Sequence, residues 1–310
     1  MKVLITGATG YIGSALVQYL DAETDHEITV HCRNLPPHFE SWRDRFSVVE
    51  ADIRDENKLS ESLDSDINAI IHLAAFNDVD TEESSKESLE VNGYGTRTIL
   101  KIAEEFDFEN VIYFSTQKVY GSNLEGTYSV ASPLDCEDDY AVTHAVAEIY
   151  CQMFPSSRDL TVNVVRPSNV FGAPVDSEID RWTLVPACFA KSAVEDNEIR
   201  LRSSGRQSRD FVSLDYVCEA VNRLLESPGS GYNIYNITSE TTFTIWDVAQ
   251  ITQQVATDVL DEGVELYRED TKPRPSNEFI VRNNLLQPPA ENDIAEKLKQ
   301  ECRLMIEMLQ

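Results

Sequence analysis

The chain has 310 residues, of which 42% are hydrophobic, and its formal net charge is −28 at pH 7. This length suits one large α/β unit or two interleaved ones, and the apolar fraction is high enough for a sizeable core. Nucleic acids and anionic membrane surfaces repel so acidic a protein, so we expect neither as a partner. The charge itself is typical of a salt-adapted or very soluble protein.

Membrane, secretory and metal-binding classes are also disfavoured. No apolar run approaches the ~20 residues that a membrane-spanning helix needs, and a strand pattern begins at once, which leaves no room for a signal peptide. We therefore expect a cytoplasmic protein. The six cysteines lack paired metal-ligand spacing and are expected to be reduced thiols without a metal; they are Cys32, Cys136, Cys151, Cys188, Cys218 and Cys302.

The opening stretch, MKVLITGATGYIG, has the pattern of a strand, a turn and a helix. Residues 3–5 are apolar strand formers, and apolar residues recur at helical spacing over 12–20. Between them, Gly7 permits a tight turn, Gly10 lets the backbone approach a pyrophosphate, and Gly13 lets the helix pack against the strand. The free N–H groups at the helix N-terminus then face the anion. This stretch predicts a dinucleotide site.

The end of the second predicted strand, residues 28–32, bears on the choice of dinucleotide. An acidic residue there usually accepts hydrogen bonds from the ribose hydroxyls of NAD. This chain has Arg33 instead, which favours the 2′-phosphate of NADP, although a solvated loop arginine is an open alternative. After the third strand, over 47–52, the carboxylate of Asp52 is placed to accept from the adenine amino group.

Strand and helix patterns then alternate. The run 69–75 is almost wholly apolar, as expected for a parallel strand covered on both faces, and His72 within it is expected to be packed rather than a ligand. A helix pattern covers 84–106, and another apolar strand covers 111–114. The order of elements predicts an α/β fold with a doubly wound, Rossmann-type parallel sheet.

The repeating pattern ends at Gly172, which suggests a second, smaller part. We expect a dinucleotide-binding domain over residues 1–172, with 211–240 returning to it. The substrate-binding part is expected over 173–210 and 241–310, interleaved with the first part because no low-complexity linker separates them.

Seven motifs follow one another in the order seen in one protein family. They are GATGYIG, Asp52-Ile53, HLAA, VNGYGT, FSTQKVYG, a tyrosine at position 140, and RPSNVFG from Arg166 to Gly172. In this order the chain resembles the extended short-chain dehydrogenase/reductases, in the branch of NAD(P)-dependent nucleotide-sugar epimerases, dehydratases and reductases. The resemblance covers nearly the whole chain.

The resemblance implies a catalytic set of Ser/Thr, Tyr and Lys. Thr116 and Tyr140 match the first two positions, but the lysine expected four residues after the tyrosine is His144. One helical turn places the side chains at 140 and 144 on the same face, so His144 can hold a cofactor ribose or tune the phenol. Histidine is cationic only when protonated, whereas lysine carries a permanent charge that favours the phenolate.

Histidine in place of lysine at position 144 should hinder oxidation of a sugar hydroxyl more than reduction of a ketone. With a phenol pKa of ~10, about one phenol in a thousand is ionised at neutral pH, a deficit of roughly 4 kcal/mol if nothing compensates. Oxidation of a sugar hydroxyl needs the phenolate, whereas reduction of a ketone needs a neutral phenol that donates a proton. His144 and Arg33 together favour a keto-sugar reductase that uses NADPH.

By resemblance the site has two sets of binding residues. Those expected at the cofactor, NADP or NAD, are Gly7, Gly10, Tyr11, Ile12, Gly13, Arg33, Asp52, Ile53, Leu73, Ala74, Ala75, Asn92, Ser115, Tyr140, His144, Arg166 and Pro167. Those expected at the nucleotide sugar are Asn169, Arg209 and Arg274. A homodimer that pairs through the helices over 84–106 and 140–154 is common in the family and is expected here.

Two alternatives to the reductase stay open at this point. One is an epimerase or dehydratase that keeps its NAD, and the other is a dinucleotide-binding protein whose catalysis is impaired by His144. The arginines at 200, 202, 206 and 209 suit a diphosphate by their planar, bidentate fork, but they also suit ion pairs with the surplus acids.

Overall fold

The computed structural model describes residues 1–156, 160–268 and 278–310. It divides into two compact units. Unit 1 comprises residues 1–122, 132–167 and 218–235, and unit 2 comprises 123–131, 168–217 and 236–310. In the described residues no helix has the length and apolar character that crossing a bilayer requires.

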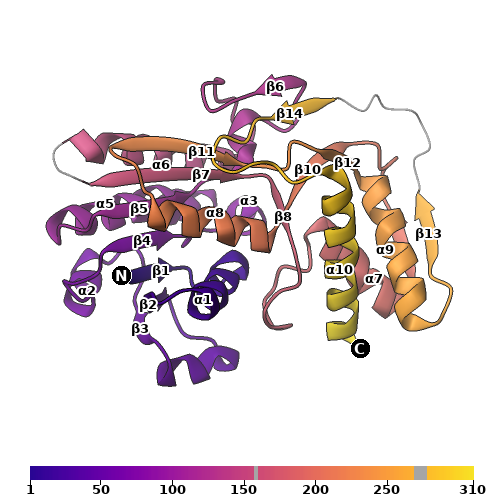
Figure 1. The fold of residues 1–310 in the computed structure, drawn as a ribbon, viewed down its shortest axis with the longest axis horizontal. Helices are drawn as coiled ribbons and strands as arrows, with labels where there is room; N and C mark the ends of the chain where they lie inside the picture. The colour runs from indigo at the N-terminus through magenta and orange to yellow at the C-terminus, as the bar shows by residue number, and fades with distance from the viewer. Residues whose placement is uncertain (157–159, 269–277) are drawn as a thin grey trace. The chain divides into compact units, whose positions relative to one another are not determined.

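Unit 1 is built on a seven-stranded sheet in the order β11-β7-β5-β4-β1-β2-β3, drawn in Figure 1. The pairings from β7 to β3 are all parallel. The order runs outward from β1 in both directions, which is the doubly wound arrangement expected from the sequence. The strands are β1 (Lys2–Thr6), β2 (Glu27–Cys32), β3 (Ser47–Glu50), β4 (Ala69–His72), β5 (Asn110–Phe114), β7 (Thr161–Pro167) and β11 (Tyr232–Ile237).

Helical segments connect these strands. They are α1 (Tyr11–Glu23), η1 (Pro37–Asp44), α2 (Glu56–Ser62), α3 (Asp78–Glu83), α4 (Ser85–Ser88), the π-helix η2 (Leu89–Gly95), α5 (Thr96–Glu105), η3 (Gln117–Tyr120), α6 (Asp139–Met153), η4 (Phe154–Ser156) and α8 (Leu214–Glu226). The predicted helix over 84–106 is thus a series of helical segments with one π turn inside it.

The core of unit 1 follows from the near-continuous apolar strands. Leu4, Ile70 and Val111 on one face of the sheet pack with Ile99 of α5 and Ala147 of α6. Residues of the opposite face, which alternate with these along each strand, are fully buried as well. Coverage of both faces is what a parallel sheet requires, so the predicted Rossmann-type α/β fold is confirmed.

The described part of unit 2 contains short sheets and three helices. The sheets are β12-β10-β8, β13-β9 and β14-β6. Their strands are β6 (Gly126–Tyr128), β8 (Asn169–Phe171), β9 (Glu198–Leu201), β10 (Ser208–Ser213), β12 (Thr242–Thr244), β13 (Glu265–Arg268) and β14 (Phe279–Val281), and the helices are α7 (Val185–Asp196), α9 (Ile245–Leu260) and α10 (Glu291–Leu309).

The three helices of unit 2 bury a separate core. Phe189 of α7, Val248 of α9 and Leu298 of α10 belong to one cluster of buried apolar residues. Helix α9 begins with a capping box, in which Thr244 accepts from the backbone of Asp247 while the Asp247 carboxylate accepts from the backbone of Thr244. The binding of the dinucleotide by unit 1 and of the substrate by unit 2 stays a prediction.

Candidate active site

The turn after β1 accepts only glycine at two positions. Gly7 has φ +65°, and a Cβ there would lie 2.8 Å from the backbone nitrogen of Ala74. A Cβ at Gly13 would lie 2.2 Å from the carbonyl oxygen of Gly7, so only glycine lets α1 start this close to the strand. The amide of Gly10 donates to the Gly7 carbonyl at 3.0 Å and closes the turn.

The N-terminus of α1 is left open to an anion. Its N-cap is Gly10, which offers no side-chain cap, and its first turn contains no acidic residue. The positive end of the helix dipole therefore favours an anion at this N-terminus. Tyr11 is buried and Ile12 is half-buried in the same turn. The glycine turn and the uncapped helix start are thus present in unit 1, and their contact with a phosphate stays a prediction.

The segments after β4 and β5 lie at the same edge of the sheet as this turn, because β1, β4 and β5 are parallel neighbours. Leu73 and Ala74 follow β4, and their amides each donate to the hydroxyl of Thr6 at 3.2 Å. Ala75 is exposed beside them. Thr116 follows β5 at the edge where ligands bind in folds of this kind.

The segments after β2 and β3 carry charged side chains. Arg33 is exposed after β2. The Asp52 carboxylate accepts from the Arg54 guanidinium at 2.8 and 2.6 Å, and these bonds lower the pKa of Asp52 to about 2. Ile53 is buried beside Gly95. The carboxylate of Asp52 is thus fixed and ionised, and whether it meets an adenine, and whether Arg33 selects NADP, stay predictions.

His72 and Asn92 are both buried and form hydrogen bonds with other residues of the protein. His72 is 1% exposed and hydrogen-bonds Thr6 at 2.6 Å and Thr96 at 3.1 Å, so it is a packed histidine as expected. Burial lowers its pKa to about 3. Asn92, in the π-helix, accepts from the amide of Phe76 at 2.7 Å and donates to Thr143 at 3.0 Å. Its amide thereby ties the segment after β4 to α6.

Tyr140 and His144 lie one turn apart near the start of α6, where Asp138 caps the helix by accepting from Ala141 at 2.7 Å. The two rings meet edge to face with centroids 4.5 Å apart. His144 is 2% exposed, and its Nδ1 is hydrogen-bonded to the hydroxyl of Tyr113 at 2.8 Å. Burial, with the nearby charge of Lys118, lowers the pKa of His144 to about 4. The imidazole is therefore neutral at physiological pH.

The other ring nitrogen of His144 is left without a partner. Nε2 is buried and makes no hydrogen bond with any residue that the structure describes. A buried polar atom of this kind needs a partner, which a ligand hydroxyl can supply. His144 can thus hold a ribose, but as a neutral imidazole it supplies no positive charge to Tyr140.

Thr116 and Lys118 approach the same helix from η3. Thr116 is the N-cap of η3, where its hydroxyl accepts from the amide of Lys118 at 3.2 Å and keeps its proton to donate. The Lys118 ammonium lies over the Tyr140 ring, 5.2 Å from its centroid. Sequence reasoning missed Lys118, although its place two residues after Thr116 was a usable signal.

A buried ion pair between Arg166 and Glu148 connects β7 to α6. Arg166 on β7 donates to the carboxylate of Glu148 on α6 at 2.8 and 2.5 Å, and to the hydroxyl of Tyr120 at 2.7 Å. Ser115 donates to Glu148 at 2.5 Å. Burial alone would lower the pKa of the Arg166 guanidinium, but Glu148 raises it. Ser115, Arg166 and the adjacent Pro167 thus fix the frame of the site, and their contact with a cofactor stays a prediction.

Unit 2 carries the predicted substrate residues. Asn169 on β8 donates to the carbonyl of Asp210 at 2.8 Å. Arg209 on β10 is half-buried, donates to the carbonyl of Ser208 at 2.9 Å, and forms no ion pair with the described residues. Arg200, by contrast, forms an ion pair with Glu198 at 3.0 Å, which is the alternative to diphosphate binding that the sequence left open for these arginines. Arg274 lies outside the described residues.

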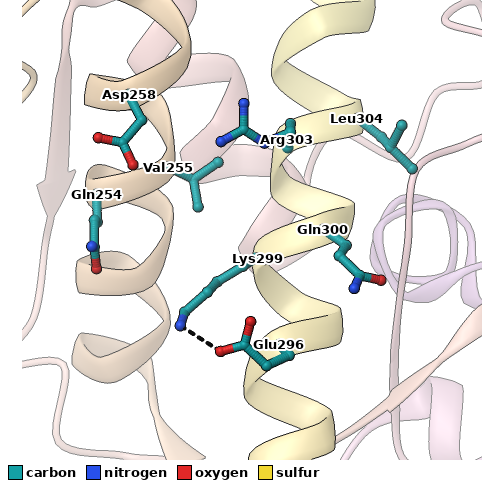
Figure 2. Close-up of a pocket in the computed structure, with 8 residues that line it drawn as sticks. All are labelled: Gln254, Val255, Asp258, Glu296, Lys299, Gln300, Arg303 and Leu304. Carbon is teal, nitrogen blue, oxygen red and sulfur yellow. Dashed lines mark hydrogen bonds and ion pairs between the residues drawn. The ribbon is translucent and has the colours of Figure 1, made fainter.

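A pocket of about 470 Å³ lies between α9 and α10 of unit 2 (Figure 2). The residues that line it include both signs of charge, with Asp258 on one helix and Arg303 on the other, and Lys299 donates to Glu296 at 2.7 Å. None of the predicted site residues that the structure describes lines it.

Comparison with known proteins agrees with the motifs. The model of the "NAD dependent epimerase/dehydratase family" matches residues 3–238. The chain is 30% identical to the low-salt glycan biosynthesis protein Agl12 of Haloferax volcanii, over 77% of this chain and 77% of that one. It is 26% identical to human dTDP-D-glucose 4,6-dehydratase, over 90% of this chain and 81% of that one.

Solved structures share the fold over the whole length. A UDP-glucose 4-epimerase from Thermotoga maritima, solved with UDP-glucose, has a TM-score of 0.84 at 20% identity and 100% coverage of both chains. A UDP-glucuronic acid 4-epimerase from Bacillus cereus, solved with UDP-glucuronic acid and NAD, has a TM-score of 0.82 at 22% identity, again with 100% coverage of both. At this identity the likeness concerns the fold.

Proposed function

Because this chain belongs to the NAD dependent epimerase/dehydratase family, and is therefore an enzyme of the short-chain dehydrogenase/reductase type, we propose that it oxidises and reduces the sugar of a nucleotide sugar. The observation that supports this most is the arrangement in unit 1. A glycine turn that fits a dinucleotide, a phenol at Tyr140 and a hydroxyl at Thr116 lie on segments at one edge of one sheet.

The residues of unit 1 fit a nicotinamide dinucleotide. Gly7 and Gly13 let α1 start close to β1, because a Cβ at either position would collide with the backbone, and the N-terminus of α1 is the kind of site that binds a diphosphate. The buried Nε2 of His144 is the atom that a ribose hydroxyl would satisfy. When bound, the dinucleotide accepts or returns the hydride of the sugar carbon.

The chain's own groups move the proton. In the oxidative direction the Tyr140 phenolate takes the proton of a sugar hydroxyl as the carbon bearing it loses a hydride and becomes a carbonyl. In the reductive direction Tyr140 returns that proton to the oxygen. Thr116 donates a hydrogen bond to the same oxygen and holds it in position. The balance is two electrons and two hydrogens in each direction.

An internal redox cycle is the form of this chemistry that we place first. The curated relatives include dTDP-D-glucose 4,6-dehydratases, and the proteins of like fold include epimerases. An epimerase or dehydratase oxidises the sugar and later reduces it, so the dinucleotide stays bound and is regenerated. The first step requires a phenolate at Tyr140.

A net keto-sugar reductase is the second candidate. It is favoured by the neutral state of His144, because a phenol without a cation from this residue serves better as a proton donor than as a base. The exposed Arg33 adds to it, since a 2′-phosphate would suit that position.

For the substrate we propose that Arg209 binds the diphosphate. Its guanidinium is half-buried in a chain of net charge −28 and yet has no carboxylate partner among the described residues. Burial lowers its pKa, which marks the cost of keeping this charge out of water. A diphosphate would compensate that cost with bidentate bonds.

We also propose a homodimer formed through α6 and the π-helix. The exposed large apolar residues of these two elements are Leu89 (45%), Tyr94 (48%), Val142 (42%), Ile149 (65%) and Met153 (53%). Positions 142, 149 and 153 recur at helical spacing, so they share a face of α6. In so acidic a chain an apolar face of this kind fits a second copy of itself.

The experiment is turnover on a panel of nucleotide sugars, with and without added NADH or NADPH. We expect turnover of one sugar nucleotide without added reductant, and retention of bound dinucleotide through purification. Tyr140→Phe should lower kcat by at least about 100-fold while the affinity for the dinucleotide stays within about twofold, because the phenol acts on the proton alone.

Tyr128→Phe, which alters a tyrosine of β6 in unit 2, is the matched control and should keep its activity. Turnover that requires added NADPH would favour the reductase over the internal cycle. Unchanged turnover in Tyr140→Phe, or no turnover of any sugar nucleotide by the native protein, would contradict the proposed function.

A further inference from the structure

Lys118 is a charged neighbour of Tyr140 that the mechanism above does not use. Its Nζ lies 5.2 Å from the centroid of the Tyr140 ring. It also donates to the Asp78 carboxylate of α3 at 3.1 Å, and this ion pair is about half exposed. Both contacts lie within unit 1.

We propose that Lys118 supplies the positive charge for proton exchange at Tyr140, in place of the lysine that the family motif has at position 144. The inference deepens the proposed function and depends on it, because it assumes that Tyr140 exchanges the proton. Lys118 acts through Tyr140 and is therefore a positioning residue.

Ionising the Tyr140 phenol at neutral pH costs free energy unless a nearby positive charge compensates. An ammonium over an aromatic ring is attracted to its face, and the attraction grows when the ring becomes a phenolate. Lys118 thus stabilises the charged form of Tyr140 relative to the neutral form. The second position of α6 adds the positive end of a helix dipole, which acts in the same direction.

The other titratable groups near Tyr140 do not supply this charge. His144 is neutral, since its pKa is lowered to about 4 by burial, and burial raises the pKa of Tyr113 so that it is neutral as well. Among the remaining groups, Asp138 and Asp139 at the start of α6 and Asp78 on α3 are acidic, and Glu148 of α6 is paired with Arg166 of β7. Of these side chains Lys118 alone is an unburied cation at the ring.

The place of Lys118 also explains why position 144 tolerates histidine. The charge of Lys118 is felt at His144, where it helps to keep the imidazole neutral. A lysine at 144 would set a second cation in this buried position, beside Tyr113 and within reach of the first. One ammonium and one neutral imidazole divide the two tasks that a single lysine performs in the motif, the charge and the ribose contact.

The ion pair between Lys118 and Asp78 allows two variants that should shift the pKa of the Tyr140 phenol in opposite directions. Its carboxylate holds Lys118 and offsets part of its charge. Removing the ammonium in Lys118→Met should therefore raise the pKa of the Tyr140 phenol, by about one unit. Removing the counter-charge in Asp78→Asn should lower that pKa. A merely structural role of Lys118 moves neither.

The measurement is an NMR titration of the protein labelled with ¹³C on the tyrosine ring carbon that bears oxygen. The chain has 12 tyrosines, so Tyr140→Phe serves to assign the resonance. Lys118→Arg should restore the native value within about half a unit, and Lys86→Met, at a lysine of α4 with 91% side-chain exposure, should leave it unchanged. The titration needs no substrate and no turnover.

The expected result is a raised phenol pKa in Lys118→Met and a lowered one in Asp78→Asn. With a substrate in hand, kcat/KM of Lys118→Met at pH 7 should fall about tenfold and recover at higher pH, which is one pKa unit expressed as rate. A phenol pKa that is the same in native protein and Lys118→Met would overturn the proposal. Failure of the proposed function is distinguishable, because the native protein would then show no turnover whatever its phenol pKa.

Discussion

At the scale of single residues, the sequence alone indicated which residues are candidates for the site, but not which other side chains surround them in the fold. The glycines at 7 and 13 could be predicted because their task depends on the local backbone, and the structure places both where a Cβ would collide. The state of His144 could not be predicted, because its pKa depends on burial and on a hydrogen bond with Tyr113, which lies 31 residues away in the chain. Lys118 was missed for the same reason, since its contact with Tyr140 joins η3 to α6.

The buried histidine has a measurable consequence for stability. In the folded protein the pKa of His144 is lowered to about 4, against about 6.5 in the unfolded chain, because burial disfavours the charged ring. The unfolded state therefore binds more protons below about pH 6.5, and stability falls as the pH drops from there towards 4. We expect His144→Gln to remove about 1–2 kcal/mol of the loss in unfolding free energy between pH 7 and pH 5.

Urea unfolding at the two pH values checks this expectation. His38→Gln, at a half-buried histidine of η1, is the comparison. The difference between pH 7 and pH 5 should shrink in His144→Gln relative to the native protein. An identical difference in both would mean that His144 is protonated as readily in the folded state as in the unfolded one.

At the scale of elements, periodicity predicted the strands and helices that bury a regular face. The helix predicted over 84–106 exists as α4, the π-helix η2 and α5, and the π turn was not foreseen. A single extra residue in a turn leaves no trace in a pattern of apolar spacing. Yet this turn carries Asn92, which bonds Phe76 and Thr143, and it carries two of the exposed apolar side chains.

The exposed face of α6 and η2 predicts an assembly that one substitution should break. Ile149 is 65% exposed, so Ile149→Glu should leave the fold of one chain intact. In a dimer the same carboxylate would be buried without a partner, which costs several kcal/mol per chain and disfavours association. Sedimentation equilibrium should give a dimer for the native protein and a monomer for Ile149→Glu.

Leu304→Glu is the matched control, because Leu304 of α10 is 50% exposed in unit 2 and outside the proposed interface. It should remain dimeric. A native protein that sediments as a monomer, or an Ile149→Glu variant with the native mass, would count against the dimer.

At the scale of the whole molecule, the alternation of strand and helix was enough to predict the doubly wound sheet, because each parallel strand needs a crossover and two covered faces. The two compact units were harder to delimit. Residues 123–131 belong to unit 2, where β6 pairs with β14, a pairing between segments about 150 positions apart that no local pattern reveals. The net charge of −28 says nothing of the fold.

The proposed chemistry requires a dinucleotide bound at the N-terminus of α1, and calorimetric titration with NAD and NADP tests this most directly. The native protein, freed of any retained dinucleotide, should bind one equivalent per chain. Gly13→Ala should weaken binding at least about tenfold, because its methyl group would lie 2.2 Å from the Gly7 carbonyl and displace α1. Gly263→Ala, where a Cβ meets nothing within 4 Å, should bind as the native protein does. Native protein that binds neither dinucleotide, or a Gly13→Ala variant that binds with native affinity, would contradict the account.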